Sequence, residues 1–206
     1  MLARQNHGEE PMARRTFIGG VAGGVALFLW GTVSHMLLPL GTAGISTISN
    51  EEAVLAAMRQ NIQAPGLYFF PGMDMSRTLT ADERRAWAQK YEQGPAGILV
   101  YRPRGGRPMS AVLLLTELAS NIAAALVAAW LFATASPLLT SLGSRVLFVA
   151  LFGLIGGLDI HVSYWNWYGF PATYTLAAML DGFIGFTVVG VVFHFVIRKH
   201  VLVVRA

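Results

Sequence analysis

Residues 172–197 read ATYTLAAMLDGFIGFTVVGVVFHFVI, an apolar stretch with one acid, Asp181, and one histidine, His194. About 20 apolar residues of helix are enough to cross the hydrocarbon core of a bilayer, which is about 30 Å thick. Three other stretches are comparable in length and composition, and they cover residues 17–40, 110–133 and 145–164. The sequence therefore predicts an all-α membrane fold, a bundle of four transmembrane helices.

The composition of the chain agrees with a membrane protein and narrows its chemistry. Hydrophobic residues make up 54% of the chain and charged residues only 13%, which is too apolar for an ordinary soluble domain. The net charge of +4 comes with no basic stripe interleaved with aromatic residues, so we expect no nucleic-acid partner. The absence of cysteine excludes disulfides, thiolate metal sites and cysteine nucleophiles.

The basic residues around the spans predict the orientation of the chain. Arg14 and Arg15 stand directly before the first span, and no basic residue follows it until Arg59. Cytoplasmic loops carry an excess of Lys and Arg, so we expect the tail at residues 1–16 to be cytoplasmic and the first span to remain an uncleaved anchor. Four crossings then return residues 198–206 to the same side.

Other basic residues agree with this orientation in part. Arg145 precedes the third span, and Arg198 follows the fourth. Arg102, Arg104 and Arg107 precede the second span on the opposite side, but a long translocated segment crosses largely regardless of its charge. The sequence therefore predicts a multi-pass protein of the bacterial inner membrane with both termini in the cytoplasm.

Residues 41–109, between the first two spans, predict a small extracytoplasmic α+β segment. Asn50 or Ser49 can cap a helix that starts at Glu51, and Thr80 to Glu83 is a capping-box pattern that opens a second helix. Two short β-prone runs, at residues 67–70 and 98–101, are able to pair. A segment this small is marginal alone, so we expect it to rest on the bundle or on a partner.

Polar residues inside the spans gather toward the extracytoplasmic side. They are His35, Glu117, Asn121, Asp159, His161 and Asp181. Each span also carries small residues that let helices approach closely: Gly20, Gly24 and Gly31; Ala124, Ala125 and Ala128; Gly153 and Gly157; Ala178, Gly182 and Gly185. The polar residues lie on or beside these stripes at helical spacing, so we expect them to face the interior and to converge in one polar cavity.

The polar cluster admits three interpretations. Interhelical hydrogen bonds that fix the register of the helices are the first, with some carboxyl groups protonated. A path for protons or cations is the second. A metal or cofactor site is the third, because His, Asp and Glu together can bind Zn, Mn or Fe, although no ligand spacing identifies the metal.

A second pattern involves the histidines and their glycines. Glycine lies four residues before His35, His161 and His194. A side chain on a helix leans over the preceding turn, so a glycine at that position leaves room for a flat macrocycle. Haem or another tetrapyrrole is therefore a candidate cofactor, with His35 and His161 as the axial pair.

Residues 164–171 read YWNWYGFP and form the densest aromatic run. Amphipathic rings prefer the membrane interface, so we expect Trp165, Trp167 and Tyr168 to be anchors at the outer interface. A quinone or lipid pocket beside Asp159 and His161 is the alternative.

The same run supports a family resemblance. The W-N-W-x-G-F-like segment, a tyrosine after it, an aspartate in the last span and residues 50–71 resemble an uncharacterised family of small bacterial inner-membrane proteins with four helices. The resemblance implies the fold and the location but no activity.

These features together predict a non-enzymatic accessory or binding subunit of a membrane complex. Its expected partners are the lipid bilayer and other membrane subunits, or a second copy of the chain. The alternative is a haem- or quinone-binding redox protein that uses His35 and His161. No serine, cysteine or phosphate-loop motif favours hydrolysis or nucleotide use.

Overall fold

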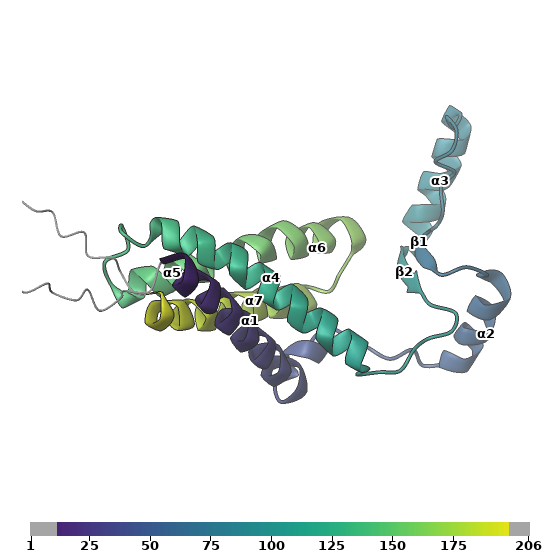
Figure 1. The fold of residues 1–206 in the computed structure, drawn as a ribbon. Coiled ribbons are helices and arrows are strands. Elements are labelled where there is room, and N and C mark those ends of the chain that lie inside the picture. Colours follow the sequence, from purple (N-terminus) through teal and green to yellow (C-terminus); the bar gives the residue numbers. More distant parts are fainter. Residues whose placement is uncertain (1–11, 198–206) are drawn as a thin grey trace, which may run out of the picture.

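A computed structural model describes residues 12–197 of the chain (Figure 1). The predicted C-terminal tail, with Arg198, and most of the predicted N-terminal tail lie outside the described residues. Within them, the structure has four long apolar helical segments: α1 (Met12–Met36), α4 (Ala111–Ala135), Leu142–Tyr168, and α7 (Ala172–Val196). At 1.5 Å per residue, each is about 37–40 Å long, which is enough to cross a hydrocarbon core of about 30 Å. The chain has the architecture of a multi-pass membrane protein.

The third long segment is not one regular helix. It consists of α5 (Leu142–Gly156), a π-helical turn η2 (Gly157–His161) and α6 (Val162–Tyr168). A π turn inserts an extra residue into the helix and is frequent at functional sites. The sequence predicted a helix over residues 145–164 without this turn, although two of the predicted site residues, Asp159 and His161, lie inside it.

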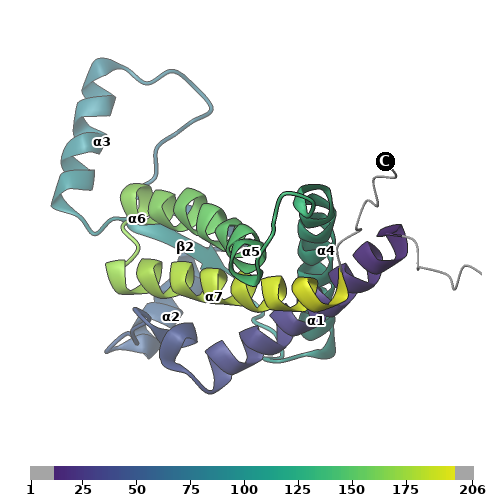
Figure 2. The ribbon, with the colours of Figure 1, turned by 90° about the vertical axis from the view of Figure 1, so that its left-hand side faces the viewer.

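The four long segments pack in the order α4, α1, α7, α5 (Figures 1 and 2). The main helix pairs are α1 with α4, α5 with α7, and α1 with α7. In contrast, α4 touches α5 and α7 only slightly. The helices therefore form a row that is joined in the middle by α1 and α7, and α4 keeps much of its surface free of other described elements.

The buried core lies where α1, α4 and α7 meet, with Val149 of α5 beside them, at the end of the bundle where α1 begins. Phe132 and Phe193 are fully buried there, with ring centroids 5.5 Å apart. Arg145 lies in the same core and is only 3% exposed. We call this the arginine end, because it also carries Arg14 and Arg15; the opposite end, where the segment after α1 begins, is the arm end.

Glycines bring the helix backbones together along these pairs, as the stripes of small residues predicted. A Cβ on Gly24 would overlap the backbone of Ile122 in α4, and a Cβ on Gly153 would overlap the backbone of Gly182 in α7. A Cβ on Gly20 would lie 2.9 Å from the Cα of Leu126. These contacts are closer than any residue with a side chain allows, so the glycines set the distances between helices.

Two members of the predicted stripes do not take part. Nothing lies within 4 Å of a Cβ built on Gly31, and Ala124 is exposed. Gly31 lies near the arm end of α1, where no other described element reaches it. Ala124 lies between Ile122 and Leu126, which do contact α1, so its own side of α4 faces away from that helix.

The segment after α1 forms an arm, which we define as residues 45–109. A short 3-10 turn, η1 (Pro39–Thr42), joins it to α1. The arm contains α2 (Glu51–Asn61), β1 (Gly66–Phe70), α3 (Ala81–Gln93) and β2 (Gly97–Tyr101). The two strands pair antiparallel, which confirms that the two β-prone runs pair. Thr80 and Glu83 form the predicted capping box, whereas the side chain of Asn50 makes no capping hydrogen bond.

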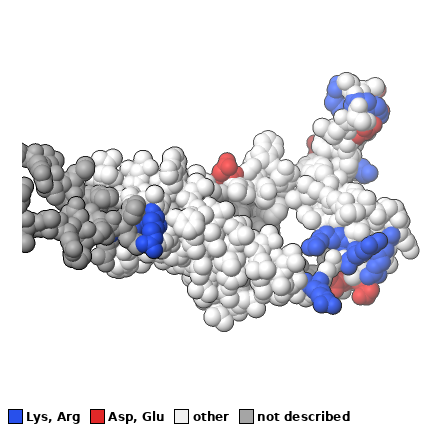
Figure 3. Space-filling model, in the orientation of Figure 1, with Lys and Arg blue, Asp and Glu red and all other residues white. Residues whose placement is uncertain are grey.

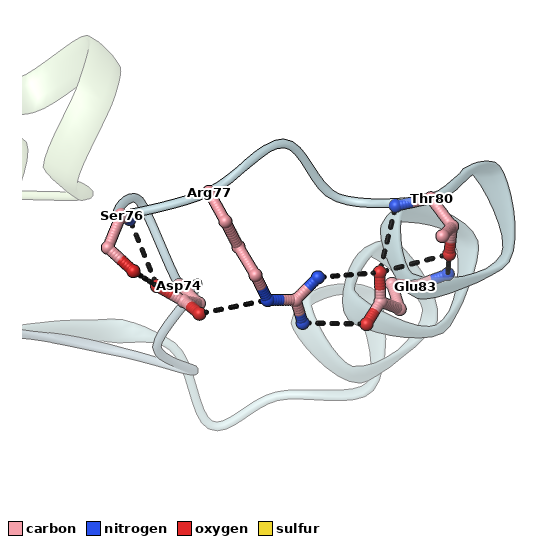
Figure 4. Close-up of polar contacts among 5 residues, drawn as sticks. All are labelled: Asp74, Ser76, Arg77, Thr80 and Glu83. Atoms are coloured by element: carbon pink, nitrogen blue, oxygen red, sulfur yellow. Dashed lines mark hydrogen bonds and ion pairs between the residues drawn. The ribbon is translucent and has the colours of Figure 1, made fainter.

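Charged side chains hold the loop before α3 in place (Figure 4). The guanidinium of Arg77 donates to both carboxylate oxygens of Glu83, at 2.7 and 3.1 Å, and to Asp74 at 3.1 Å. Arg77 and the hydrogen bonds from Thr80 lower the pKa of Glu83 to about 2. Hydrogen bonds from Ser76 lower the pKa of Asp74. These exposed contacts order the start of α3.

The arm has little core of its own and extends away from the bundle (Figure 1). Trp87 of α3 donates to the carbonyl of Pro71 at 3.0 Å and stacks on Tyr91, which in turn stacks on Phe69 of β1. Among the arm residues, all of which are described, only Pro71 is buried. Charged side chains gather on the arm, whereas the bundle surface in the same view is almost uncharged (Figure 3).

Candidate functional site

The predicted polar residues do not all face the interior of the bundle. Asn121, His161 and Asp181 are half-buried, but His35, Glu117 and Asp159 are exposed. The expectation that all six would converge in one interior cavity is therefore wrong for the exposed three. Two separate causes explain Glu117 and Asp159.

Asp159 is exposed because it lies on the wrong side of its helix. The face of this segment that packs on α7 runs through Gly153, Gly157 and the half-buried His161. Residues two apart on a helix point in nearly opposite directions, so Asp159, two positions after Gly157, faces outward. The sequence pattern pairs Asp159 with Gly156, but nothing lies within 4 Å of a Cβ built on that glycine.

Glu117 is exposed for a different reason. It lies one turn before Asn121 and two turns before the buried Ala125, so it is on the packing face of α4, as predicted. That face has no helix opposite it at this level, because α1 has diverged from α4. The carboxylate of Glu117 thus lies on an apolar helix surface, next to the exposed Leu113 and Leu114.

Asp181 makes the polar contact between α1 and α7. The indole Nε1 of Trp30 donates to the carboxylate Oδ1 of Asp181 at 2.8 Å and approaches its backbone carbonyl at 3.1 Å. Gly185, one turn further along α7, makes room for this contact, since a Cβ there would lie 3.0 Å from Cδ1 of Trp30 and 2.7 Å from Leu27. Asp181 is therefore held inside the bundle by a neutral donor.

Trp30 is a site residue that the sequence pattern did not reveal. A buried indole N–H needs an acceptor, and Asp181 belongs to an apolar span where donors are scarce. The two residues also lie at similar heights, each within about two and a half turns of the arm end of its helix. The similar depth of Trp30 and Asp181 in their spans is the sequence feature that could have predicted this contact.

His161 has a distinctive environment at the π turn. Its ring meets Tyr174 of α7 edge to face, with centroids 6.1 Å apart. Its Nδ1 atom is buried and has no hydrogen-bond partner among the described residues. Tyr174 also packs on Phe170, and Phe170 on Tyr164, so an aromatic chain closes the arm end between α6 and α7.

His35 lies in the last turn of α1, apart from these rings. Its Nδ1 is 2.8 Å from the hydroxyl of the buried Ser34 and 3.1 Å from the carbonyl of Gly31. The chain folds back over the ring through η1, because a Cβ on Gly41 would lie 2.7 Å from Cδ2 of His35. These contacts fix the ring at the end of the helix.

The glycines that precede the histidines do not leave the predicted space for a macrocycle. A Cβ on Gly157 would lie 3.1 Å from Cγ of Met179, and one on Gly190 would lie 3.0 Å from the backbone of Val146. These two glycines, which precede His161 and His194, serve helix packing. Only Gly31, before His35, faces open space, so the glycine pattern gives no support for a tetrapyrrole between His35 and His161.

The predicted metal ligands are not assembled either. Across residues 12–197, no three His, Asp or Glu side chains lie close enough together to hold a metal ion. The imidazole of His194 lies toward the arginine end with its Nδ1 buried, and it has no hydrogen-bond partner among these residues. The donor set that the sequence suggested is therefore spread over the bundle.

The aromatic run forms α6 and the turn after it. Trp165, Trp167 and Tyr168 are 51%, 70% and 42% exposed, so their rings point outward at the arm end. Such exposure is compatible with rings at a membrane interface, and their role as interface anchors stays a prediction. An apolar groove of about 280 Å³ lies between α6 and α7, and its walls are Val162, Trp165, Ala172, Thr175, Leu176 and Met179.

One polar group belongs to this groove. The hydroxyl of Thr175 is buried and makes no hydrogen bond to another described residue. The surface of the groove is therefore apolar, and the hydroxyl of Thr175 is buried beneath it without a hydrogen-bond partner among the described residues.

Comparisons of the chain with protein-family models, with curated proteins and with solved structures found no match.

Proposed function

We propose that the chain is a non-enzymatic subunit of a larger membrane assembly, and that the exposed surfaces at Glu117 and at Asp159 each face another membrane-spanning segment. The observation that supports this is the exposure of both carboxylates on helices apolar enough to cross a membrane. The other segment belongs to a different membrane protein or to a second copy of this chain.

Both carboxylates lie well inside the long helical segments. Glu117 lies six residues inside α4, and Asp159 lies nine residues before the end of its segment, about 9 Å and 13 Å from the helix ends. A carboxylate at the centre of a bilayer costs at least about 2.5 kcal/mol, and somewhat less nearer the interface. A neighbouring helix with hydrogen-bond donors removes this cost, whereas lipid chains do not.

The membrane and the orientation belong to the same proposal. We place the protein in a bacterial inner membrane with both termini in the cytoplasm and the arm outside. The positions of Arg14, Arg15 and Arg145 at the end of the bundle opposite the arm support this, since cytoplasmic ends are enriched in basic residues.

A crosslinking experiment in the native membrane tests the proposal. A photoreactive residue is placed at Leu113 and at Ile155, which lie one turn from Glu117 and Asp159 and are 49% and 61% exposed. The controls are Val127 and Leu147 on the same two helices, which are 61% and 54% exposed. We expect a discrete protein adduct at the first pair and mainly lipid adducts at the second.

Two double variants test whether the carboxylates are the reason for the contact with another protein. Glu117→Leu with Asp159→Leu removes the need for a polar neighbour, so we expect a larger share of small species on a native gel. Glu51→Leu with Glu52→Leu removes two exposed carboxylates from the arm and should leave the native size unchanged. Lipid adducts alone at every position, together with a monomer of unchanged size in all variants, would contradict the proposal.

A second candidate is the binding of a quinone or a lipid in the groove between α6 and α7. The apolar walls of this groove favour it, because small-molecule sites are lined predominantly by apolar side chains. Solvent extraction of the purified protein, with an absorption spectrum, tests this candidate and the haem alternative together. Protein that is colourless and releases no quinone would remove both.

A further inference from the structure

The loop from β2 to α4 carries three arginines, Arg102, Arg104 and Arg107, just before α4 begins at Ala111. All three are exposed. In the part of the chain that the structure describes, none of them makes an ion pair or a side-chain hydrogen bond. Other arginines of the arm do: Arg77 pairs with Glu83 and Arg85 with Asp82.

Two of these arginines line a hollow in the arm. The hollow has a volume of about 400 Å³ and forms where the chain leaving α2 passes the chain leaving β2. Its walls are Gln63, Pro65, Arg102, Pro103, Arg104 and Gly105. This volume lies within the range of about 300–1,000 Å³ that is typical of small-molecule sites.

The backbone around the hollow is held in a defined shape. The N–H of Gly105 donates to the carbonyl of Arg102 at 3.0 Å, and Gly105 has a φ of +59°, so residues 102–105 form a tight turn. Pro65 and Pro103 restrict the chain on both sides of the hollow. The guanidinium of Arg102 lies near Gly106, since a Cβ there would be 3.5 Å from its Nη2.

The charged groups in the walls are two guanidiniums, and both are donors. Each guanidinium carries five N–H donors and a charge that persists at every physiological pH. The amide of Gln63 uses one of its hydrogens on the carbonyl of Gln60, at 3.2 Å, and keeps the other. No wall residue carries a carboxylate, so the hollow is complementary to an anion.

We infer that this hollow binds a phosphate group. Guanidinium groups match phosphate oxygens in pairs of parallel hydrogen bonds, and two unpaired arginines beside one hollow favour an anion with several oxygens. The phosphate is carried by an anionic lipid headgroup or is free in solution. The hollow lies a few residues before α4 begins, close to where a membrane-spanning helix would meet the lipid headgroups. This site is independent of Glu117 and Asp159.

Binding measurements on the full-length protein in a neutral detergent test the inference. The probes are inorganic phosphate and short-chain phosphatidic acid, and short-chain phosphatidylcholine is the zwitterionic reference. Arg102→Gln with Arg104→Gln removes both charges from the hollow. Arg84→Gln with Lys90→Gln removes two exposed charges from α3 and serves as the matched control.

We expect the double variant in the hollow to bind the anionic probe at least about tenfold more weakly, and the control to bind within about twofold of the wild type. Binding of phosphatidic acid alone identifies a lipid, whereas binding of both probes identifies the phosphate itself. Failure of the wild type to bind either probe, or equal weakening in the two double variants, would overturn the inference.

A conservative variant covers the case in which the glutamine variant does not fold. Arg102→Lys with Arg104→Lys keeps the charge but loses the paired geometry of the guanidinium, so its affinity should lie between the other two. An affinity equal to that of the wild type would show that the guanidinium pair is not what recognises the ligand, and it would also overturn the inference.

Discussion

At the scale of single residues, Arg145 ties two helices together inside the bundle. Its Nη2 donates to the carbonyl of Ile197, just after α7 ends, and its guanidinium lies 4.7 Å from the ring of Phe132. The last carbonyls of a helix lack partners within the helix and carry a partial negative charge, so a buried cation there is stabilised. The sequence placed this residue in a loop as an indicator of topology, but it lies in the first turn of α5 and is part of the core.

We expect Arg145→Ala to destabilise the folded protein by about 2–4 kcal/mol, because it leaves both a cavity and an unpaired carbonyl. Arg145→Met keeps most of the volume, so its cost should be smaller, about 1–2 kcal/mol. Leu147→Ala on the same helix is the control, since Leu147 is exposed. Unfolding in mixed micelles with increasing SDS measures all three. Equal stability of Arg145→Ala and Leu147→Ala would show that the arginine is not a structural residue.

At the scale of the elements, the glycines of α1 offer a sharp contrast. Gly24 is buried against the backbone of Ile122, and Gly31 has open space around its Cα. Gly24→Ala should cost about 1–3 kcal/mol, because α1 and α4 must move apart. Gly31→Ala should be neutral or stabilise the helix by up to about 1 kcal/mol. The same SDS titration reports both, and an equal loss at the two positions would mean that the α1–α4 contact is not as close as described.

The sequence predicted the elements better than their mutual placement. Length and hydropathy identified the four spans, and the capping box at Thr80 and the β-prone runs identified α3 and the hairpin, because these signals are local. The exposure of Glu117 depends on the crossing of α1 and α4, which no local pattern contains. The π turn at residues 157–161 gave no signal beyond the pair Gly156–Gly157.

For the candidate site too, local features were easier to predict than contacts between helices. The histidine–glycine spacing predicted room for a macrocycle, but at Gly157 and Gly190 another helix fills that space, and nothing lies over Gly31. Asp181 was expected to face the interior, and the indole of Trp30 shows how it is satisfied there. Its partner lies on another helix, so no local pattern in α7 identifies it, and only the matching depth of Trp30 in the first span points to it.

At the scale of the whole molecule, charge separates the two ends of the bundle. The charged side chains of the arm lie beyond one end of the long helices (Figure 3). The bundle surface next to the arm is almost uncharged in the same view (Figure 3). Arg14, Arg15 and Arg145 lie at the other end. If the long helices cross a membrane, the arm and the loop between α4 and α5 must therefore lie on opposite sides of it.

The absence of cysteine makes this arrangement testable with single substitutions. Met75 in the arm and Leu138 in the α4–α5 loop are both 84% exposed, so Met75→Cys and Leu138→Cys present thiols of equal access to water. In intact spheroplasts, a membrane-impermeant maleimide should label Met75→Cys and should reach Leu138→Cys only after permeabilisation. The reverse pattern would invert the proposed orientation. Labelling of both positions before permeabilisation would place the two loops on the same side of the membrane. That result would contradict the proposal that α4, which lies between them, crosses the membrane.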